Sequence, residues 1–154
     1  MIRKVDLFFT FLAKQYIDLF TMIKKLTMYY DGLCPLCQAE ILFLSRRNEA
    51  NLLSFVDINS SQYSASAVGV SCQQALDSIY AQYDDGELIN GVDVFSAAYE
   101  RANLPTLAWL FSRSSLRPIL TWGYQFFAKN RHIISSIFGP VTLCIMKAVG
   151  KQKL

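Results

Sequence analysis

Short apolar runs alternate with helix-like segments along the first part of the chain. Residues 26–30 are apolar and aromatic and end at the turn signal Asp31-Gly32, which predicts a buried strand. Residues 35–47 contain good helix formers and end in two arginines, which predicts a helix. Residues 52–58 form a second apolar run of strand length. Because this order is strand, helix, strand, it predicts a βαβ unit with parallel strands.

The next part of the chain is predicted to complete the sheet. Residues 59–69 are rich in serine and typical of a loop, and Ser71 is a candidate N-cap for a short helix through Leu76. Residues 78–83 and 87–90 flank a turn signal, which predicts an antiparallel hairpin. The expected fold class is therefore α/β, with a small mixed sheet of about four strands flanked by helices.

Helices are predicted for most of the remaining chain, as a helical C-terminal extension. Asp93 is the expected N-cap of a helix over residues 94–103. Pro105 fits the first turn of a short helix. Pro118 fits the first turn of another helix, which is expected to end at about Lys129.

The stretch at residues 133–146 carries no charge but contains a Gly-Pro pair. It is expected to form two short apolar segments that pack on the domain, because fourteen residues with such a break are too few to span a membrane. Cys144 within it is expected to be a buried thiol. Several aromatic side chains of this half are expected to pack in the core: Trp109, Trp122, Tyr124, Phe126 and Phe127.

Residues 1–25 are predicted to form an amphipathic helix, because polar residues recur there at spacings of three and four. Lys14 interrupts the apolar run and no small-residue cleavage site follows, so a signal peptide is not expected. Packing of this helix on the domain or on a second copy is favoured over contact with a membrane surface. The oligomeric state is left open.

Length and composition indicate one folded domain with terminal extensions. The 154 residues are 53% hydrophobic and 18% charged, which excludes disorder. The net charge of +3 is too small to indicate a nucleic-acid partner. Four cysteines are too few for a disulfide scaffold, so a reduced, cytoplasmic chain is expected. The expected division is a helix over residues 1–25, the domain over 26–133 and an apolar helical tail over 134–154.

The candidate chemistry lies at Cys34-Pro35-Leu36-Cys37, where the first predicted helix begins. Pro35 suits the first helical turn, so Cys34 is expected at the N-cap, where free N–H groups and the helix dipole stabilise a thiolate. Cys37 falls about one turn later, within disulfide reach, and is expected to be the less exposed sulfur. An exposed Cys34 thiolate would then attack a disulfide, and Cys37 would resolve the mixed disulfide.

Other titratable residues are candidates for smaller roles. Asp31 has two open roles, as a cap of the turn or as an acid or base, although a carboxylate near a thiolate raises the thiol pKa. Glu40 could carry protons from an inward position, but a solvent-facing position is expected. Cys72 is expected to be a bystander. His132, the single histidine, is expected at the surface or near a helix end.

A zinc site is the main alternative to a redox site, and no cofactor is expected otherwise. Zinc would need two further ligands, and Cys72, His132 and Cys144 are the candidates. None of them forms a second closely spaced pair, so their spacing disfavours zinc. Two cysteines without function, and a redox fold that has become an interaction module, are the other interpretations.

The segment Tyr30-Asp31-Gly32-Leu33-Cys34-Pro35-Leu36-Cys37 resembles the signature of the DCC family, named for its Asp-Cys-Cys motif. Three further segments resemble the family in the same order, at residues 55–58, 85–93 and 124–131. The resemblance implies a thioredoxin-like fold and thiol-disulfide oxidoreductase activity on a protein or small-molecule thiol or disulfide.

The resemblance also bears on two details of the site. It matches Arg131 to an arginine of the family, expected either in a surface ion pair or near the Cys pair, where it would support the thiolate. In thioredoxins a cis-proline precedes the strand that faces the Cys pair and presents backbone to a bound peptide. Residues 76–78 take that place here and contain no proline, so docking of a peptide in the thioredoxin manner is in doubt.

Overall fold

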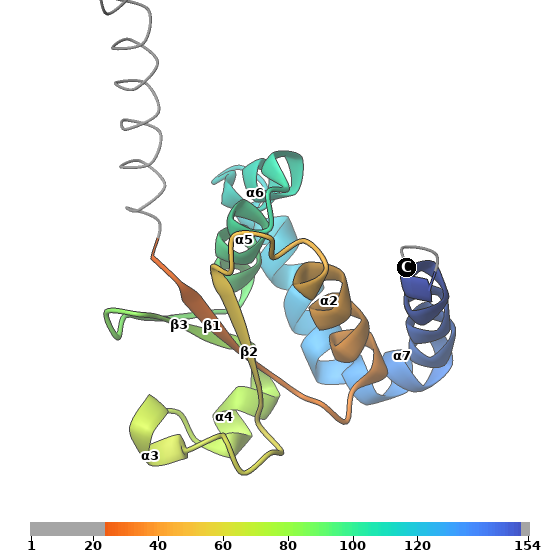
Figure 1. The fold of residues 1–154 in the computed structure, drawn as a ribbon, viewed down its shortest axis with the longest axis horizontal. Helices are drawn as coiled ribbons and strands as arrows, with labels where there is room; N and C mark the ends of the chain where they lie inside the picture. Colours follow the sequence, from red (N-terminus) through yellow and green to blue (C-terminus); the bar gives the residue numbers. More distant parts are fainter. Residues whose placement is uncertain (1–23, 152–154) are drawn as a thin grey trace, which may run out of the picture.

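The computed structural model describes residues 24–151, so nearly all of the helix predicted for residues 1–25 lies outside the described chain. Within this range the chain forms a mixed sheet of strand order β2-β1-β3-β4, with helices on both sides (Figure 1). The predicted α/β, thioredoxin-like fold class is confirmed.

The sheet is built around a βαβ unit and a hairpin. Strand β1 (Leu26–Tyr30) continues into helix α2 (Pro35–Ser45), which returns the chain to β2 (Leu53–Asp57), parallel to β1. Strand β3 (Tyr80–Tyr83) runs antiparallel to β1 and forms a hairpin with β4 (Leu88–Asn90). The predicted βαβ unit and the predicted hairpin are both confirmed.

The central strand β1 divides the core because successive side chains of a strand point to opposite faces. Leu26 and Met28 are fully buried on one face, where they pack with Leu44 of α2 and with Val94 of α5 (Val92–Arg101). The opposite face carries a smaller cluster beneath α4 (Cys72–Asp77), formed by Tyr29, Ile58, Val70 and Ala75. Because both faces of β1 are buried, its C-terminal end is fixed in place, and the segment that carries Cys34 and Cys37 begins there.

Short helices cover the second face of the sheet. Helix α3 (Ala65–Val68) lies in the segment predicted as loop and ends at Gly69, whose φ of +78° suits glycine. Helix α4 begins after Ser71 as predicted, and a capping box joins Ser71 to Gln74.

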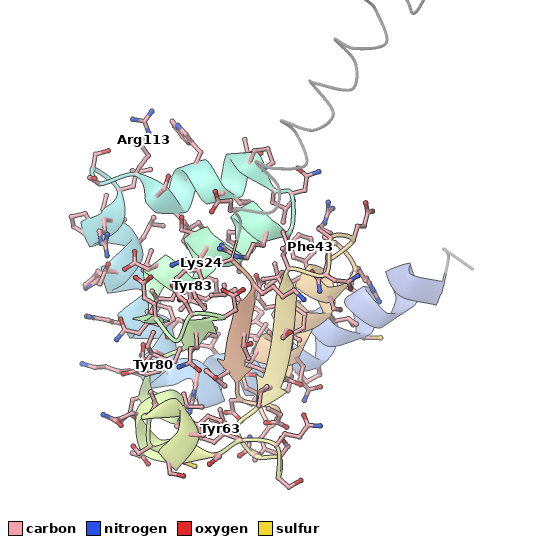
Figure 2. All side chains as sticks on the ribbon, turned by 60° about the vertical axis from the view of Figure 1, so that its left-hand side comes forward. Lys24, Phe43, Tyr63, Tyr80, Tyr83 and Arg113 are labelled. Atoms are coloured by element: carbon pink, nitrogen blue, oxygen red, sulfur yellow. The ribbon has the colours of Figure 1, made fainter. Side chains whose placement is uncertain are left out.

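The start of the described chain is tied to the hairpin. The ammonium group of Lys24 lies 5.6 Å from the ring centre of Tyr83 and pairs with Asp85 (Figure 2). The backbone carbonyl of Lys24 accepts a hydrogen bond from the buried Arg101 side chain at 2.7 Å. These contacts fix the point where β1 begins.

Helix α5 begins earlier than predicted. Gly91, with a φ of +63°, precedes its first residue, so the chain has already turned into the helix before Asp93. Asp93 lies in the first turn and pairs with Arg117. The prediction that Asp93 is the N-cap is therefore wrong, whereas α6 (Pro105–Ser112) begins at its proline as predicted.

Helix α7 (Arg117–Lys151) is a single element of 35 residues. The predicted end at about Lys129 and the predicted division of residues 133–146 into two short segments are wrong. Pro140 lies inside the helix, and α7 changes direction in its blue part, so that it lies beside α2 (Figure 1). Proline commonly kinks a helix without ending it. The expected domain boundary at residues 133 and 134 falls inside this helix.

Helices α6 and α7 leave apolar side chains exposed. Trp109, Trp122 and Phe126 are exposed, Trp122 to 70%, so the prediction that they pack in the core is wrong. Trp122 and Phe126 instead stack on one another, with ring centres 6.1 Å apart. Cys144 is also exposed and not buried as expected. Among residues 24–151, no helix has the length and apolar character needed to cross a membrane.

Candidate dithiol site

The two cysteines meet at the N-terminus of α2. Cys34 is the N-cap residue, and its sulfur accepts a hydrogen bond from the backbone N–H of Cys37 at 3.3 Å. Pro35 occupies the first turn, as predicted. The two Sγ atoms lie 2.6 Å apart, and both cysteines are free. The placement of a close pair at a strand-to-helix turn is therefore confirmed.

Asp31 holds the turn that leads into α2. Its Oδ1 accepts hydrogen bonds from the Leu33 N–H at 3.0 Å and from the Asn59 side chain at 2.9 Å. Its backbone carbonyl accepts one from the Cys34 N–H at 3.1 Å. The carboxyl is buried, and its Oδ2 lies 3.8 Å from the Arg131 guanidinium. Of the two roles considered for Asp31, this geometry supports the turn cap.

Ser135 is a site residue that the sequence did not reveal. It lies on α7, 101 residues after Cys34, and is only 3% exposed. Its Oγ accepts a hydrogen bond from the Leu36 N–H at 3.3 Å and lies 3.5 Å from the Cys34 sulfur. Because Leu36 supplies one of these protons, the serine hydroxyl can direct its own proton to Cys34.

A glycine allows this close approach of α7 to the cysteines. A Cβ atom on Gly139 would lie 2.6 Å from Cβ of Pro35, well inside van der Waals contact. The α7 residue that lies this close to Pro35 must therefore be glycine. The small residues within the apolar stretch at 133–146 were the available signal for this contact.

The cover by α7 reverses the expected exposure of the two sulfurs. Cys34 is buried, at 2% exposed, whereas Cys37 is only partly buried. The expectation of an exposed Cys34 beside a covered Cys37 is therefore wrong. Its physical cause is that Ser135 and Gly139 of α7 lie over the first turn of α2.

The hydrogen bonds of the site place the negative charge on Cys34. The hydrogen bond from the Cys37 thiol, with weaker ones from Ser135 and from the Cys37 N–H, outweighs burial and lowers the pKa of Cys34 to about 6. The same shared hydrogen bond, together with burial and the charges of Cys34 and Asp31, strongly raises the pKa of Cys37, and Arg131 opposes this only in part. The reduced pair therefore carries one proton, on Cys37, at neutral pH.

The alkylation rate of Cys34 is expected to follow a thiolate that forms near pH 6. Since the lowered pKa of Cys34 is about 6, its reactive fraction rises through pH 6 and is nearly constant above about pH 7. Iodoacetamide labelling of the reduced protein, followed by peptide mass spectrometry between pH 5 and 9, measures this profile. A Cys34 rate that still rises steeply above about pH 8, as for an ordinary thiol, would contradict the assignment.

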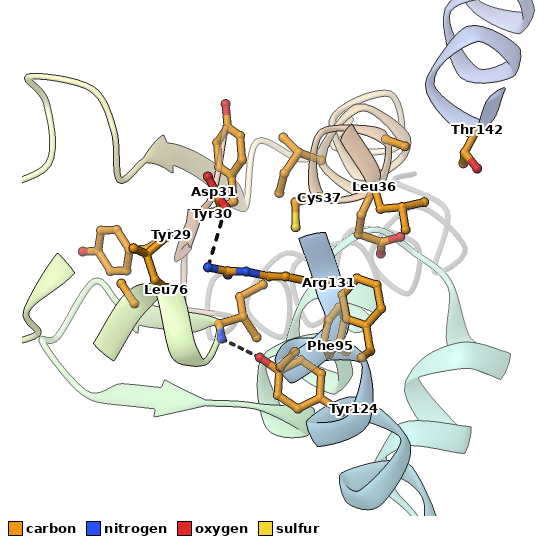
Figure 3. A pocket seen from close by; sticks show the side chains of 17 residues that line it. Tyr29, Tyr30, Asp31, Leu36, Cys37, Leu76, Phe95, Tyr124, Arg131 and Thr142 are labelled. Carbon is orange, nitrogen blue, oxygen red and sulfur yellow. Dashed lines mark hydrogen bonds and ion pairs between the residues drawn. The ribbon is translucent and has the colours of Figure 1, made fainter. Parts of the chain in front are cut away.

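A cavity of about 320 Å³ opens beside Cys37 (Figure 3). Cys37 lines it, and Cys34 does not. The Arg131 side chain reaches across it to Asp31, so the position near the Cys pair, and not a surface ion pair, is the one observed for Arg131 (Figure 3). Most of the remaining wall is apolar or aromatic and includes Leu36, Leu76, Ile79, Phe95, Tyr124 and Phe127.

Glu40 points into the protein and not into solvent, contrary to expectation. Its side chain lines the cavity, and its Oε1 is buried without a hydrogen-bond partner among residues 24–151. Burial raises the pKa of Glu40, which the neighbouring Tyr99 hydroxyl offsets in part. Helix α2 is apolar on nearly all sides, so the sequence did not show which face was inward.

The two remaining cysteines do not line the cavity. Cys72 and Cys144 are both exposed, and the side chain of His132 lies outside the described part of the chain. In the part of the chain that the structure describes, no three histidine, cysteine or acidic side chains are grouped so that they could hold a metal ion. The zinc interpretation stays an untested alternative, because His132 is one of its candidate ligands.

The sheet order and the surrounding helices define a thioredoxin-like fold, with two neighbouring cysteines at its β1–α2 turn. The family model described as DCC1-like thiol-disulfide oxidoreductase matches residues 28–136, and the chain belongs to this family. The resemblance found in the sequence is thereby confirmed.

A relative extends this comparison. The chain is similar to an uncharacterized chloroplastic protein of Arabidopsis thaliana, with 36% identity over 135 residues, which cover 84% of this chain and 61% of the relative. The chain thus matches less than two thirds of the length of that relative. No solved structure matches the chain.

Proposed function

We propose that the protein is a thiol-disulfide oxidoreductase in which Cys34 and Cys37 alternate between a dithiol and a disulfide. The observation that carries this proposal is the pair itself, with sulfurs 2.6 Å apart at the N-terminus of α2. Membership of a family of that description supports it. Its partners are thiols or disulfides, and a cytoplasmic location stays a prediction.

The reduced state of the pair is stabilised at Cys34. A thiolate with a pKa of about 6 at a helix N-terminus is both a competent nucleophile and a good leaving group. Stabilising that thiolate stabilises the dithiol relative to the disulfide, and this makes the pair more oxidising. The sequence predicted that Cys34 attacks first, which assumed an exposed Cys34. Because Cys34 is covered, the cysteine that first meets the substrate has to be assigned again from the structure.

A redox titration tests the proposal. The protein, carrying Cys72→Ser and Cys144→Ser so that only the pair remains, is equilibrated in glutathione buffers of graded potential, alkylated and analysed by mass spectrometry. Cys34 and Cys37 are expected to become protected together, as one two-electron step, and the matched variant that also carries Cys37→Ser should show no such step.

Two outcomes would contradict the proposal. Cys34 and Cys37 titrating independently, each with glutathione, would show that no internal disulfide forms. Alkylation that begins only after a chelator is added would show that the pair is held by a metal.

A further inference from the structure

We propose that the cavity beside Cys37 is the substrate site, that it takes a small, uncharged, apolar thiol or its disulfide, and that the mixed disulfide forms on Cys37. This inference rests on the proposed redox function of the pair. It names the kind of substrate and the sulfur that meets it.

Access to the two sulfurs is the first argument. Exchange requires the incoming sulfur to reach the sulfur that it attacks. Cys34 is buried beneath Ser135, and Gly139 of the same helix is in close contact with Pro35. Cys37 lines the open cavity. A substrate can therefore reach Cys37 without moving α7, whereas it can reach Cys34 only if α7 separates from α2.

The chemistry of the cavity wall is the second argument. A cavity of about 320 Å³ with mostly apolar walls suits a small molecule. Its cation, Arg131, is 3.8 Å from the carboxylate of Asp31, so it offers little free charge to an anion. Glu40 contributes a buried carboxyl whose Oε1 is unpartnered within residues 24–151, and this carboxyl can bond one polar atom of a ligand. These features favour an apolar, uncharged ligand.

The segment before β3 argues against a peptide substrate. In a thioredoxin-like site this backbone would have to offer free hydrogen-bonding groups to an extended chain. Here the Ile79 N–H donates to the Tyr124 hydroxyl at 2.6 Å, and the Ile79 carbonyl accepts from the Gly91 N–H at 2.9 Å. Figure 3 shows Tyr124 on α7 reaching this backbone at the edge of the cavity. Because α7 already occupies this position, a small molecule fits better than a chain.

The exchange then proceeds in two balanced steps. Each uncharged substrate thiol, RSH, enters the cavity and releases its proton to solvent as it attacks. The first thiolate, RS⁻, attacks Sγ of Cys37 in the Cys34–Cys37 disulfide, the S–S bond breaks, and its electron pair leaves with Cys34 as a thiolate. A second RS⁻ attacks the sulfur of R in the mixed disulfide and releases Cys37, which takes up a proton. Two substrate thiols are oxidised to RSSR and the protein disulfide is reduced to the dithiol. The reverse sequence reduces RSSR.

The roles of the two sulfurs agree with their surroundings. The leaving thiolate is Cys34, which receives the hydrogen bonds of the site and whose pKa is lowered to about 6. A thiol of low pKa leaves faster in disulfide exchange. The attacked sulfur is that of Cys37, which is the accessible one. The less stable thiolate of the pair, that of Cys37, is therefore not the first leaving group.

The test uses two reagents that form mixed disulfides with the same leaving group. Benzyl methanethiosulfonate transfers an apolar group, and 2-sulfonatoethyl methanethiosulfonate transfers a charged one. Labelling rates at each cysteine are measured by peptide mass spectrometry in the full-length Cys34→Ser and Cys37→Ser variants. Cys72, which is exposed, serves as the internal reference within each chain.

Three changes in labelling rate are expected. In Cys34→Ser, loss of the neighbouring thiolate removes the largest cause of the raised Cys37 pKa, so Cys37 should label roughly tenfold faster than Cys34 does in Cys37→Ser. The preference for the benzyl reagent should be roughly tenfold greater at Cys37 than at Cys72. Ala128→Phe, which fills the cavity, should slow benzyl labelling of Cys37 roughly fivefold or more, whereas Ala67→Phe on exposed α3 should not.

Opposite results would overturn the inference. Faster labelling of Cys34 than of Cys37 would place the mixed disulfide on Cys34, and equal reagent preference at Cys37 and Cys72 would exclude an apolar site. Unchanged labelling in a folded Ala128→Phe chain would exclude the cavity, and Ala128→Leu serves if the phenylalanine variant does not fold. If the pair instead fails to titrate in glutathione buffers, the proposed function itself is wrong, whichever cysteine is labelled.

Discussion

Replacing Gly139 with alanine is expected to separate α7 from α2 and to expose Cys34. The added Cβ would lie 2.6 Å from Cβ of Pro35, whose ring cannot rotate away, so α7 must move. Overpacking of this kind costs about 1–3 kcal/mol in the free energy of unfolding. Cys34, now 2% exposed, should then react with iodoacetamide roughly tenfold faster at pH 7.5.

Gly123 provides a matched control on the same helix. A Cβ there would meet no atom within 4 Å, so Gly123→Ala should gain only the better helix propensity of alanine, about 1 kcal/mol. Both glycines lie inside α7, so both variants gain this propensity, and they are expected to differ in urea unfolding by the overpacking cost alone, about 1–3 kcal/mol. Equal stability and equal Cys34 labelling in both variants would show that the contact between Gly139 and Pro35 does not keep Cys34 covered.

Replacing Ser135 with alanine is expected to raise the pKa of Cys34 from about 6 toward that of an ordinary thiol. The variant loses the hydroxyl that lies 3.5 Å from the Cys34 sulfur, and a hydrogen bond to a charged group is worth about 1.5–3 kcal/mol. A change of about 1.4 kcal/mol corresponds to one pH unit. The midpoint of the Cys34 alkylation profile should therefore move up by about one pH unit, and the pair should become less oxidising.

The neighbouring serine separates this effect from a general loss of structure. Ser136→Ala removes an exposed hydroxyl that donates to the Ile133 carbonyl of its own helix, so its alkylation profile should match that of the unchanged protein. Ser135→Thr keeps a hydroxyl and should restore most of the low pKa of Cys34. A Ser135→Ala profile that still has its midpoint near pH 6 would show that Cys37 and the helix terminus suffice without the serine.

The local part of the site was predictable because short-range rules determine it. The run at residues 26–30, the Asp31-Gly32 turn and Pro35 at a first helical turn fix where β1 ends and where α2 begins. Those rules place Cys34 at the N-cap and Cys37 one turn later, as observed. The hairpin and the parallel β1–β2 pairing follow in the same way from apolar periodicity and turn residues.

The surroundings of the pair were not predictable because they come from contacts distant in sequence. Gly139 and Pro140 indicated a break in the local pattern, but the glycine serves a contact with Pro35 and the helix continues through the proline. The inward position of Glu40 depends on which side of an almost wholly apolar helix meets α7. Exposure of the cysteines followed from that packing, so it could not be derived from the motif.

The distance between Cys34 and Ser135 along the chain has a consequence for biosynthesis. The serine is added 101 residues after the cysteine, which at about 5–20 residues per second takes roughly 5–20 s. During that interval β1, α2 and β2 can form, but the cysteine pair has neither its cover nor the serine hydroxyl. A nascent chain therefore presents an uncovered dithiol to cellular oxidants, and the finished environment of Cys34 is acquired only when α7 docks.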